Sequence, residues 1–416
     1  MRTRLVKVAV VATMLGWLAA AFGFSAGSAG ASGTPLKIAF ITSQTGVASS
    51  EFQGSQQGFL ARVALQNAEG GVNGQKIDPI VLNDQSGTST VAAAVNDAIS
   101  QGAIGVVSNT PFMFAGYKIL QQQGIPVTGG SFDGPEWGVQ PNTNMFASDS
   151  GSIDPTYPAN TGFGAFMKAH GGTVLGSYGY GISPSSSRSA EDTATSVKDA
   201  GLKVGVLDTT VSFGGVDFTT AALQAKQAGV NTVWAAMDNN SNFALVQAFE
   251  QAGVHLKVVV FPTGLEADVI HSPAWQSLQN VYFLDETHPF QEPNAATTTF
   301  KNALVKYEHM SPKSFPPFDV VEAWMGADLM IKGIELAGKN PTHAGIIHAL
   351  RHVTAYNAGG LLAESFNYAT NFGHDAPQTC EYYLQAKANG FVPVAGASPF
   401  CGKDIPGSGT VSAPSA

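Results

Sequence analysis

The feature that most constrains this fold is a repeated local pattern, in which an amphipathic helix ends at a glycine and a short apolar strand follows. Glycine suits this point because the residue after a helix often needs a positive φ. The apolar segments are nearly continuous, which is typical of parallel strands covered on both faces. Helices alternating with such strands predict doubly wound α/β sheets, in a binding protein or in a single large enzyme. The glycines and segments are Gly71 before Lys76–Leu82, Gly102 before Ile104–Val107, Gly124 before Pro126–Thr128, Gly172 before Thr173–Ser177, Gly201 before Val204–Leu207, Gly229 before Thr232–Met237 and Gly253 before Lys257–Phe261.

The pattern is interrupted once, by a stretch rich in Gly, Pro, Asp, Asn and Ser at residues 129–161. Two runs of strands separated by such a stretch predict two lobes, in line with a chain longer than the usual single core. Helices predicted from residue 294 onward are expected to return to the first lobe. We therefore predict an N-terminal lobe of residues 35–148 plus 286–370 and a C-terminal lobe of 149–284 plus 371–405. The Gly-, Ser- and Pro-rich residues 406–416 are predicted to be a disordered tail.

Residues 1–31 have the features of a secretory signal peptide. Arg2, Arg4 and Lys7 precede a 17-residue apolar run, and Ala29-Gly30-Ala31 fits the small-x-small pattern of a cleavage site. The run is at the short limit for a membrane span, and no cysteine lies near the cleavage point to carry a lipid. We expect a secreted, periplasmic or cell-surface protein.

The charge balance excludes nucleic acid as a partner. Three of the 21 Lys and Arg residues lie in the predicted signal, so 18 remain against 30 Asp and Glu. Phosphate binding depends on clustered Lys and Arg. The chain has two cysteines, Cys380 and Cys401, and an isolated pair in an exported protein predicts a disulfide.

Ligands of open parallel sheets bind beyond the carboxyl ends of the strands. Hydroxyl and glycine residues there in the first half offer N–H groups and a helix N-terminus to a carboxylate. Aromatic and acidic residues in the second half suit an apolar group and a cation. For any single residue, helix capping explains the same residue type. The candidate ligand-binding residues are Gln44, Ser108, Asn109, Thr110, Gly130, Ser131, Phe132, Tyr178, Asp238, Thr263 and Glu266.

Motifs of catalysis and cofactor binding are not found. The stretch Gly333–Asn340 matches a phosphate loop up to its last position, where Asn340 replaces the Ser or Thr that would hold magnesium, so we interpret it as a helix C-terminus. His348 and His352 share a helix face at i,i+4 without an evident third metal ligand, which indicates a solvated face. We expect no enzyme activity, no metal and no cofactor.

The chain resembles the type I, leucine-binding-like periplasmic binding proteins of branched-chain amino-acid ABC importers. The best-matching stretches are Leu36–Ala68, with Ser43-Gln44-Thr45-Gly46 and Gly54-Ser-Gln-Gln-Gly58, then Gly70-Gly71-Val72-Asn73-Gly74 and Asn83-Asp84-Gln85. The resemblance implies two Rossmann-like lobes joined by three crossovers, with a ligand cleft between them that closes by hinge bending. It implies a small-molecule ligand, an ABC permease as partner and a monomer.

The resemblance also assigns roles to residues. Ser108–Thr110 and Gly130–Phe132 correspond to the family's carboxylate site, while Tyr178 falls near and Asp238 at second-lobe contacts. Where amino-acid binders place a glutamate for the ammonium group, this chain has Thr263, and Glu266 is the next acid. The ligand is therefore expected to be an amino acid, another small carboxylate, an amide or an aromatic compound. Two alternatives are a ligand sensor of the same fold that acts on a receptor and a secreted α/β hydrolase.

Overall fold

The computed structural model describes residues 33–52, 54–130, 135–137, 142–149, 158–265, 268–271, 275, 280–369, 379–388, 390–396 and 398–409, all within one compact unit, Ala31–Ala416. The predicted signal peptide and the candidates Ser131, Phe132 and Glu266 lie outside these residues. Of the predicted tail, residues 406–409 are described, and Ser408 Oγ accepts a 2.8 Å hydrogen bond from Ala159 N.

The first sheet is a five-stranded parallel sheet with the strand order β2-β1-β3-β4-β5. Three strands, β2, β3 and β4, lie where the helix-glycine-strand pattern predicts them. The fifth, β5, lies inside the stretch predicted to be irregular, because three residues are too few for a periodic signal. The strands are β1 (Leu36–Thr42), β2 (Ile77–Asn83), β3 (Gly105–Asn109), β4 (Val127–Gly129) and β5 (Met145–Ala147).

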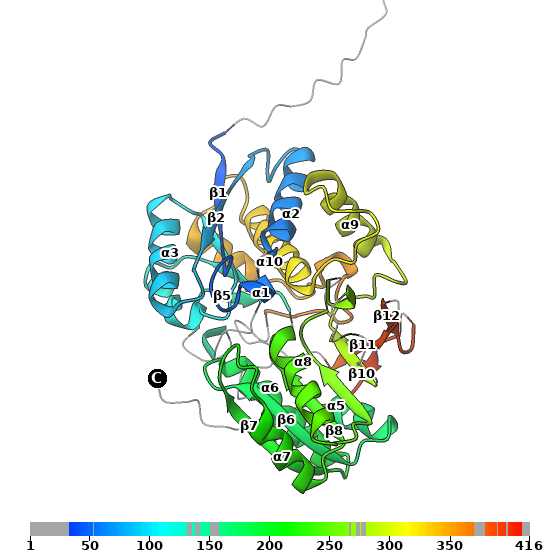
Figure 1. Ribbon diagram of the computed structural model, residues 1–416. Helices are drawn as coiled ribbons and strands as arrows, with labels where there is room; N and C mark the ends of the chain where they lie inside the picture. The colour runs from blue at the N-terminus through cyan, green and yellow to red at the C-terminus, as the bar shows by residue number, and fades with distance from the viewer. Residues whose placement is uncertain are drawn as a thin grey trace, which may run out of the picture. The chain divides into compact units, whose positions relative to one another are not determined.

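Helices from two distant parts of the chain cover this sheet. One face packs against α2 (Gln56–Ala68), α9 (Ala295–Tyr307), α10 (Phe318–Ala337) and α11 (His343–Leu350) in one hydrophobic cluster. The other face packs against α3 (Thr88–Ser100) and α4 (Tyr117–Gln122). Figure 1 shows α3 and α10 on opposite sides of β1. Shorter helices are α1 (Ser49–Phe52), η1 (Met113–Ala115), η2 (Pro135–Trp137), η3 (Asp268–His271) and η5 (Ala358–Gly360).

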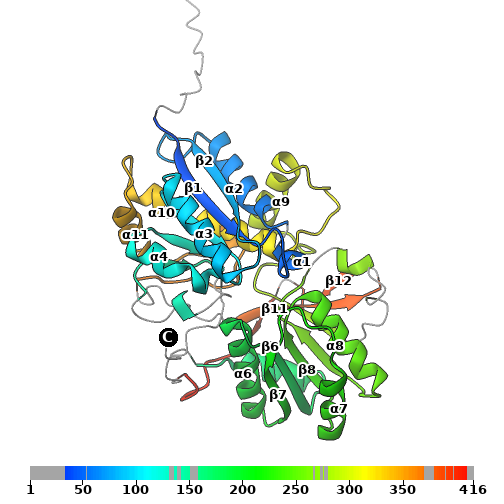
Figure 2. The same ribbon diagram turned by 60° about the vertical axis from the view of Figure 1, so that its left-hand side comes forward.

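The second sheet has eight strands, in the order β12-β11-β10-β9-β8-β6-β7 with β13 paired to β11. Its parallel part is β6 (Val174–Tyr180), β7 (Lys203–Val211), β8 (Thr232–Ala236), β9 (Val258–Phe261) and β10 (Val281–Asp285). The C-terminal strands β11 (Cys380–Lys387), β12 (Gly390–Pro393) and β13 (Phe400–Cys401) are antiparallel. Helices α5 (Thr161–Ala169) and α6 (Pro184–Asp199) pack on one face, and α7 (Thr219–Ala228) and α8 (Asn239–Gln251) pack on the other. Figure 2 shows α6 and α8 on opposite sides of β6 and β8.

Strand β7 departs from the continuous apolar pattern predicted for the strands. It lies at the edge of its sheet, and its residues alternate between exposed and half-buried. An edge strand has one neighbour and one less covered face, so it does not need side chains that are apolar on both sides. Leu207 remains 45% exposed there.

Two glycines illustrate two different structural roles, one at a helix end and one at a helix-helix contact. Gly229 ends α7 in the left-handed conformation, with φ 71° and ψ 31°, which a residue without a Cβ adopts at little cost. Gly58 of α2 has a different role: a Cβ there would lie 1.8 Å from the carbonyl oxygen of Val320 in α10. Gly58 therefore allows α10 to approach α2 closely.

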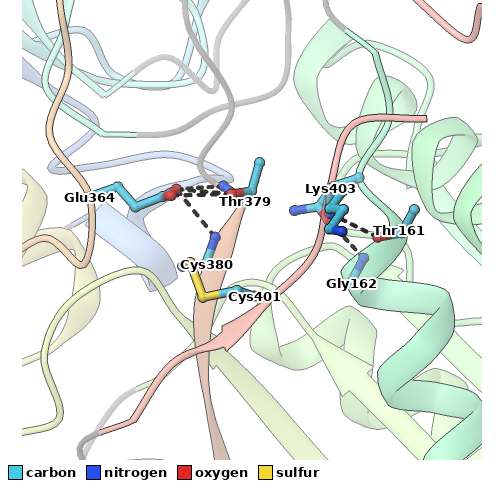
Figure 3. Close-up of a disulfide and its surroundings, with 8 residues drawn as sticks. Thr161, Gly162, Glu364, Thr379, Cys380, Cys401 and Lys403 are labelled. Carbon is cyan, nitrogen blue, oxygen red and sulfur yellow. Dashed lines mark hydrogen bonds between the residues drawn. A yellow bond between two sulfur atoms is a disulfide. The ribbon is translucent and has the colours of Figure 1, made fainter. Parts of the chain in front are cut away.

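The predicted disulfide is confirmed: Cys380 of β11 is bonded to Cys401 of β13 (Figure 3). The residues around it connect three segments of the chain. Glu364 accepts hydrogen bonds from Thr379 N at 2.6 Å and Cys380 N at 3.3 Å, and Thr161 N at the start of α5 donates to Lys403 O at 2.9 Å. Within the described residues, no helix is long and apolar enough to cross a membrane.

Candidate functional site

A cavity of the described structure lies at the carboxyl ends of the strands, where the sheet topology predicts a ligand site. It holds about 1000 Å³ of empty space, part of it open solvent. Pro111 follows β3 of the first sheet, while Tyr180, Met237, Thr263 and Glu286 follow or end four strands of the second. The remaining lining residues are Glu51, Phe52, Asp149, Phe163, Ser183, Ser185, Ser186, Ser189, Asp192, Phe213, Trp234, Ala236, Pro262, Leu284, Phe318, Glu322 and Glu381.

A second cavity of about 480 Å³ shares part of this wall. The shared residues are Pro262, Thr263, Leu284, Glu286, Phe318 and Glu322. Residues found only in the second cavity include Phe290, Phe315 and Met325, so it extends the site into a mostly apolar region. A ligand of the first cavity thus has room for an apolar extension.

Aromatic rings form much of the wall. Trp234 of β8 is buried, its Nε1–H donates to Ser189 Oγ at 3.1 Å, and its ring lies 4.9 Å from that of Phe163. Tyr180 stacks at a tilt on Phe213, with 4.6 Å between ring centroids. Large flat apolar surfaces with few polar groups are typical of small-molecule sites.

Helix α6 supplies a row of polar side chains. Ser185, Ser189 and Asp192 follow at spacings of four and three residues, which places them on one helix face. All three line the cavity. Asp192 forms an ion pair with Arg188 one turn earlier, with 3.0 Å between Arg188 Nε and Asp192 Oδ2. Burial nevertheless raises the pKa of Asp192 to about 7.

Carboxylates dominate the charged groups of the wall. Burial raises the pKa of Glu322 well above its ordinary range, and the nearby charges of Asp149, Glu286, Asp319 and Glu51 raise it further. Glu381 of β11 is 4% exposed, and burial likewise raises its pKa well above the ordinary range. Among the described residues, Oε2 of Glu322 and Oε2 of Glu381 are buried without a hydrogen-bond partner.

The described first-lobe candidates lie close together, outside the lining of this cavity. Ser108, Asn109 and Thr110 are fully buried, and none of them lines the cavity. Thr110 donates to Asp84, Asn109 Nδ2 donates to Asp319 O at 2.9 Å, and Ser108 Oγ has no partner. Gly130 N donates to Ser108 O at 3.2 Å, and the half-buried Gln44 donates its N–H to Asn83 Oδ1 at 3.0 Å. Their ligand roles remain predictions.

Of the described second-lobe candidates, Thr263 lines the cavity, and Tyr178 and Asp238 do not. Thr263 lines both cavities, with its hydroxyl bonded to Met237 O at 2.5 Å. Asp238 is 4% exposed and caps α8, accepting from Asn240 N at 2.9 Å and Ser241 N at 3.2 Å. Tyr180 also donates to Asp238, so Asp238 holds a lining residue in place. Tyr178 is fully buried in the core and does not line the cavity.

Sequence reasoning missed Trp234, Glu322, Glu381 and the serines of α6. The rule that ligands bind at strand ends points to the loops after strands, whereas these residues lie within β8, α10, β11 and α6. The one available signal was the Ser185–Ser189–Asp192 spacing, a polar row on an otherwise amphipathic helix. The phosphate-loop match keeps its interpretation as a helix C-terminus, because α10 ends at Ala337 inside it.

The comparisons with known proteins agree with this geometry. The family profile described as "Periplasmic binding protein" matches residues 35–390. No curated protein sequence matches the chain. Among solved structures, a fatty acid ABC transporter substrate-binding protein from Thermomonospora curvata is similar at TM-score 0.73 and 15% identity, with 92% of this chain and 96% of the other covered.

Two further structures have the same fold. The branched-chain amino acid transporter substrate-binding protein LivJ from Streptococcus pneumoniae, in complex with isoleucine, matches at TM-score 0.69 and 17% identity over 87% of this chain and 99% of its own. A solute-binding protein of an ABC transporter from R. palustris, in complex with benzoate, matches at TM-score 0.66 and 18% identity over 91% and 99%.

Two packed α/β sheets with a cavity at their strand ends define a solute-binding protein of the two-lobed type. The chain belongs to the periplasmic binding protein family, whose members act outside the cytoplasm. The fold and family predicted from the sequence are confirmed.

Proposed function

We propose that the protein captures a small solute in the cavity at the strand ends and delivers it to an ABC permease. The observation that carries the proposal is the composition of the cavity wall. Pro111, Phe318 and Glu322 come from elements of the first sheet's layers, and Tyr180, Trp234 and Thr263 come from the second sheet. A solute that contacts both sets favours the arrangement in which they are close together.

Capture by hinge closure follows from how the chain connects the sheets. It leaves the first sheet after β5, returns after β10, and leaves again before β11. We propose that these three passages separate two lobes, of residues 35–148 plus 286–370 and 149–284 plus 371–405. Hinges absorb a change of backbone angles over a few residues at element ends, as at Leu284–Thr287.

The wall chemistry supports binding rather than hydrolysis. A serine nucleophile needs a base within hydrogen-bond reach. The lining contains Ser183, Ser185, Ser186 and Ser189, but the described lining residues include neither His, the usual activating base of a serine nucleophile, nor Lys. We propose that the mature protein begins after Ala31, acts as a monomer and does not turn over its ligand.

Intrinsic fluorescence provides a direct test, because Trp234 lines the cavity and Trp275 packs elsewhere, against Phe283 and Phe391. The mature protein is titrated with amines, amino acids, amides and aromatic acids while fluorescence and melting temperature are recorded. A bound solute should raise the melting temperature. Its fluorescence response should disappear in Trp234→Phe and persist in Trp275→Phe. Hydrolysis of generic esters, or a response lost only in Trp275→Phe, would contradict the proposal.

A further inference from the structure

The charge of the cavity wall indicates the chemical class of the solute. Among its described lining residues are six acids and no Lys, Arg or His: Glu51, Asp149, Asp192, Glu286, Glu322 and Glu381. Like charges held at one site oppose each other's ionisation, and the effect grows where water is excluded. A wall of this composition is unfavourable to an anion and favourable to a cation.

Glu322 and Glu381 give the strongest indication of a cationic ligand. Glu381 is 4% exposed, and Oε2 of each residue is buried without a hydrogen-bond partner. Neither residue belongs to an ion pair of the described structure, such as Arg62–Asp328 or Arg188–Asp192. A buried carboxylate oxygen that lacks a donor, in a group without a counter-charge, is costly, so such a group is typically kept for an external partner or held protonated.

The shape of the site distinguishes an organic cation from a metal ion. No three Asp, Glu, His or Cys side chains in the described residues come close enough together to hold a metal. The cavity is also far larger than an ion needs, at about 1000 Å³ with its open part. Trp234, Phe163 and Phe318 line the same cavity as the acids, and aromatic rings attract organic cations as well as apolar groups.

We infer that the solute is a protonated amine carried on an apolar or aromatic body, and that it lacks a carboxylate. The inference rests on the proposed function and specifies its substrate class. Glu322 and Glu381 receive the ammonium group, and the aromatic wall with the apolar second cavity receives the body. The hydroxyl residues Ser108 and Thr110, which the sequence predicts for a carboxylate, do not line this cavity.

Ligands that share one body and differ only in their charged groups test which charged group the site binds. The probes are 2-phenylethylamine, phenylalanine and 3-phenylpropionate, with 3-methylbutylamine, leucine and 4-methylpentanoate as an aliphatic set. Binding to the mature protein is measured by calorimetry at pH 8. The amines should bind at least tenfold more tightly than the amino acid and carboxylate of the same set. Glu322→Gln and Glu381→Gln should each weaken amine binding about ten- to a hundredfold, because each removes a charge-assisted contact.

Glu335→Gln is the matched control, since Glu335 lies on the same helix as Glu322 but is exposed. A second readout needs no ligand: relief of repulsion in Glu322→Gln should raise the melting temperature at pH 8, and Glu335→Gln should leave it unchanged. Tighter binding of a carboxylate or an amino acid would overturn the inference while leaving solute capture intact. Absence of amine binding combined with an unchanged melting temperature of Glu322→Gln would also overturn it.

Discussion

The carboxylate of Glu364 accepts a 2.6 Å hydrogen bond from the backbone N–H of Thr379, the residue directly before disulfide-bonded Cys380 (Figure 3). The Thr379 hydroxyl donates to the same carboxylate at 3.1 Å, and Cys380 N donates at 3.3 Å. Glu364 follows the helices that cover the first sheet, and Thr379 leads into β11 of the second. This side chain therefore connects the two halves of the fold where the chain passes between them for the third time.

Replacing Glu364 with Gln should destabilise the protein. The substitution keeps one acceptor oxygen but removes the charge that strengthens the bonds from Thr379 and Cys380. Hydrogen bonds to charged groups contribute about 1.5–3 kcal/mol, so we expect a loss in that range in urea unfolding. Glu69→Gln, at an exposed position after α2, is the control. A variant as stable as the control would show that these bonds contribute nothing.

Removing the disulfide should cost more than most single substitutions. The bond closes a loop with a sequence separation of 21, for which the chain-entropy estimate is about 3 kcal/mol. The double variant Cys380→Ser, Cys401→Ser should unfold at correspondingly lower urea concentration. Thiol titration of the denatured, unreduced wild type should detect no free thiol, and two free thiols in oxidatively folded protein would refute the pairing.

A methyl group at Gly58 should separate α2 from α10. The new Cβ would lie 1.8 Å from Val320 O, and that oxygen belongs to a helix backbone that cannot rotate away. Overpacking of this kind costs about 1–3 kcal/mol or more. Gly54→Ala is a close control, because a Cβ there meets nothing within 4 Å. Calorimetric melting should show a lower temperature for Gly58→Ala alone, and equal shifts in both variants would count against the explanation.

Asp285 should make stability fall as the pH rises toward neutrality. Burial raises the pKa of Asp285 to about 7 in the folded protein, above its ordinary 3.8. The unfolded chain therefore releases this proton near pH 4 and the folded protein near pH 7, so the folded state binds more protons in between. Stability is lost across that window, by up to about 4 kcal/mol for a shift of about three units.

Asp285→Asn should remove this part of the pH dependence. The amide keeps the oxygen that accepts from Thr287 N at 2.8 Å and Thr287 Oγ1 at 2.7 Å, but it does not titrate. Urea unfolding at intervals between pH 4 and 8 should give a shallower decline than in the wild type. The exposed Asp78→Asn is the reference. An unchanged decline in Asp285→Asn would assign the pH dependence to other buried acids.

Ser108→Ala distinguishes the site predicted from the sequence from the cavity at the strand ends. The Ser108 hydroxyl oxygen is buried without a partner and does not line the cavity, so its removal should leave solute affinity unchanged and stability equal or slightly higher. If Ser108 held a ligand carboxylate, Ser108→Ala would instead weaken binding about ten- to a hundredfold. Calorimetric titration of both proteins with the same solute decides between these outcomes.

The sequence by itself determined the layers of the fold. Apolar runs such as Val258–Phe261 and helix-ending glycines such as Gly229 are local signals, set by burial on both faces and by backbone conformation. They sufficed for seven parallel strands, β2 to β4 and β6 to β9, and the isolated cysteine pair sufficed for the disulfide. These signals predicted the edges of the second sheet less well, where β7 alternates and the C-terminal strands are antiparallel. The structure of an edge strand depends on its neighbours, which local sequence does not reveal.

Only the tertiary structure decided which side chains meet at the cavity. The rule that ligands bind at the carboxyl ends of strands identified Thr263. Ser108 and Asp238 also lie at strand ends, but Ser108 is buried in the interior and Asp238 caps α8. Glu322 and Glu381 come from a helix and a strand separated by 59 positions, and nothing in the sequence near either one indicates the other. Their proximity to one cavity depends on α10 packing on the first sheet while β11 extends the second, and long-range packing of this kind leaves no local pattern in the sequence.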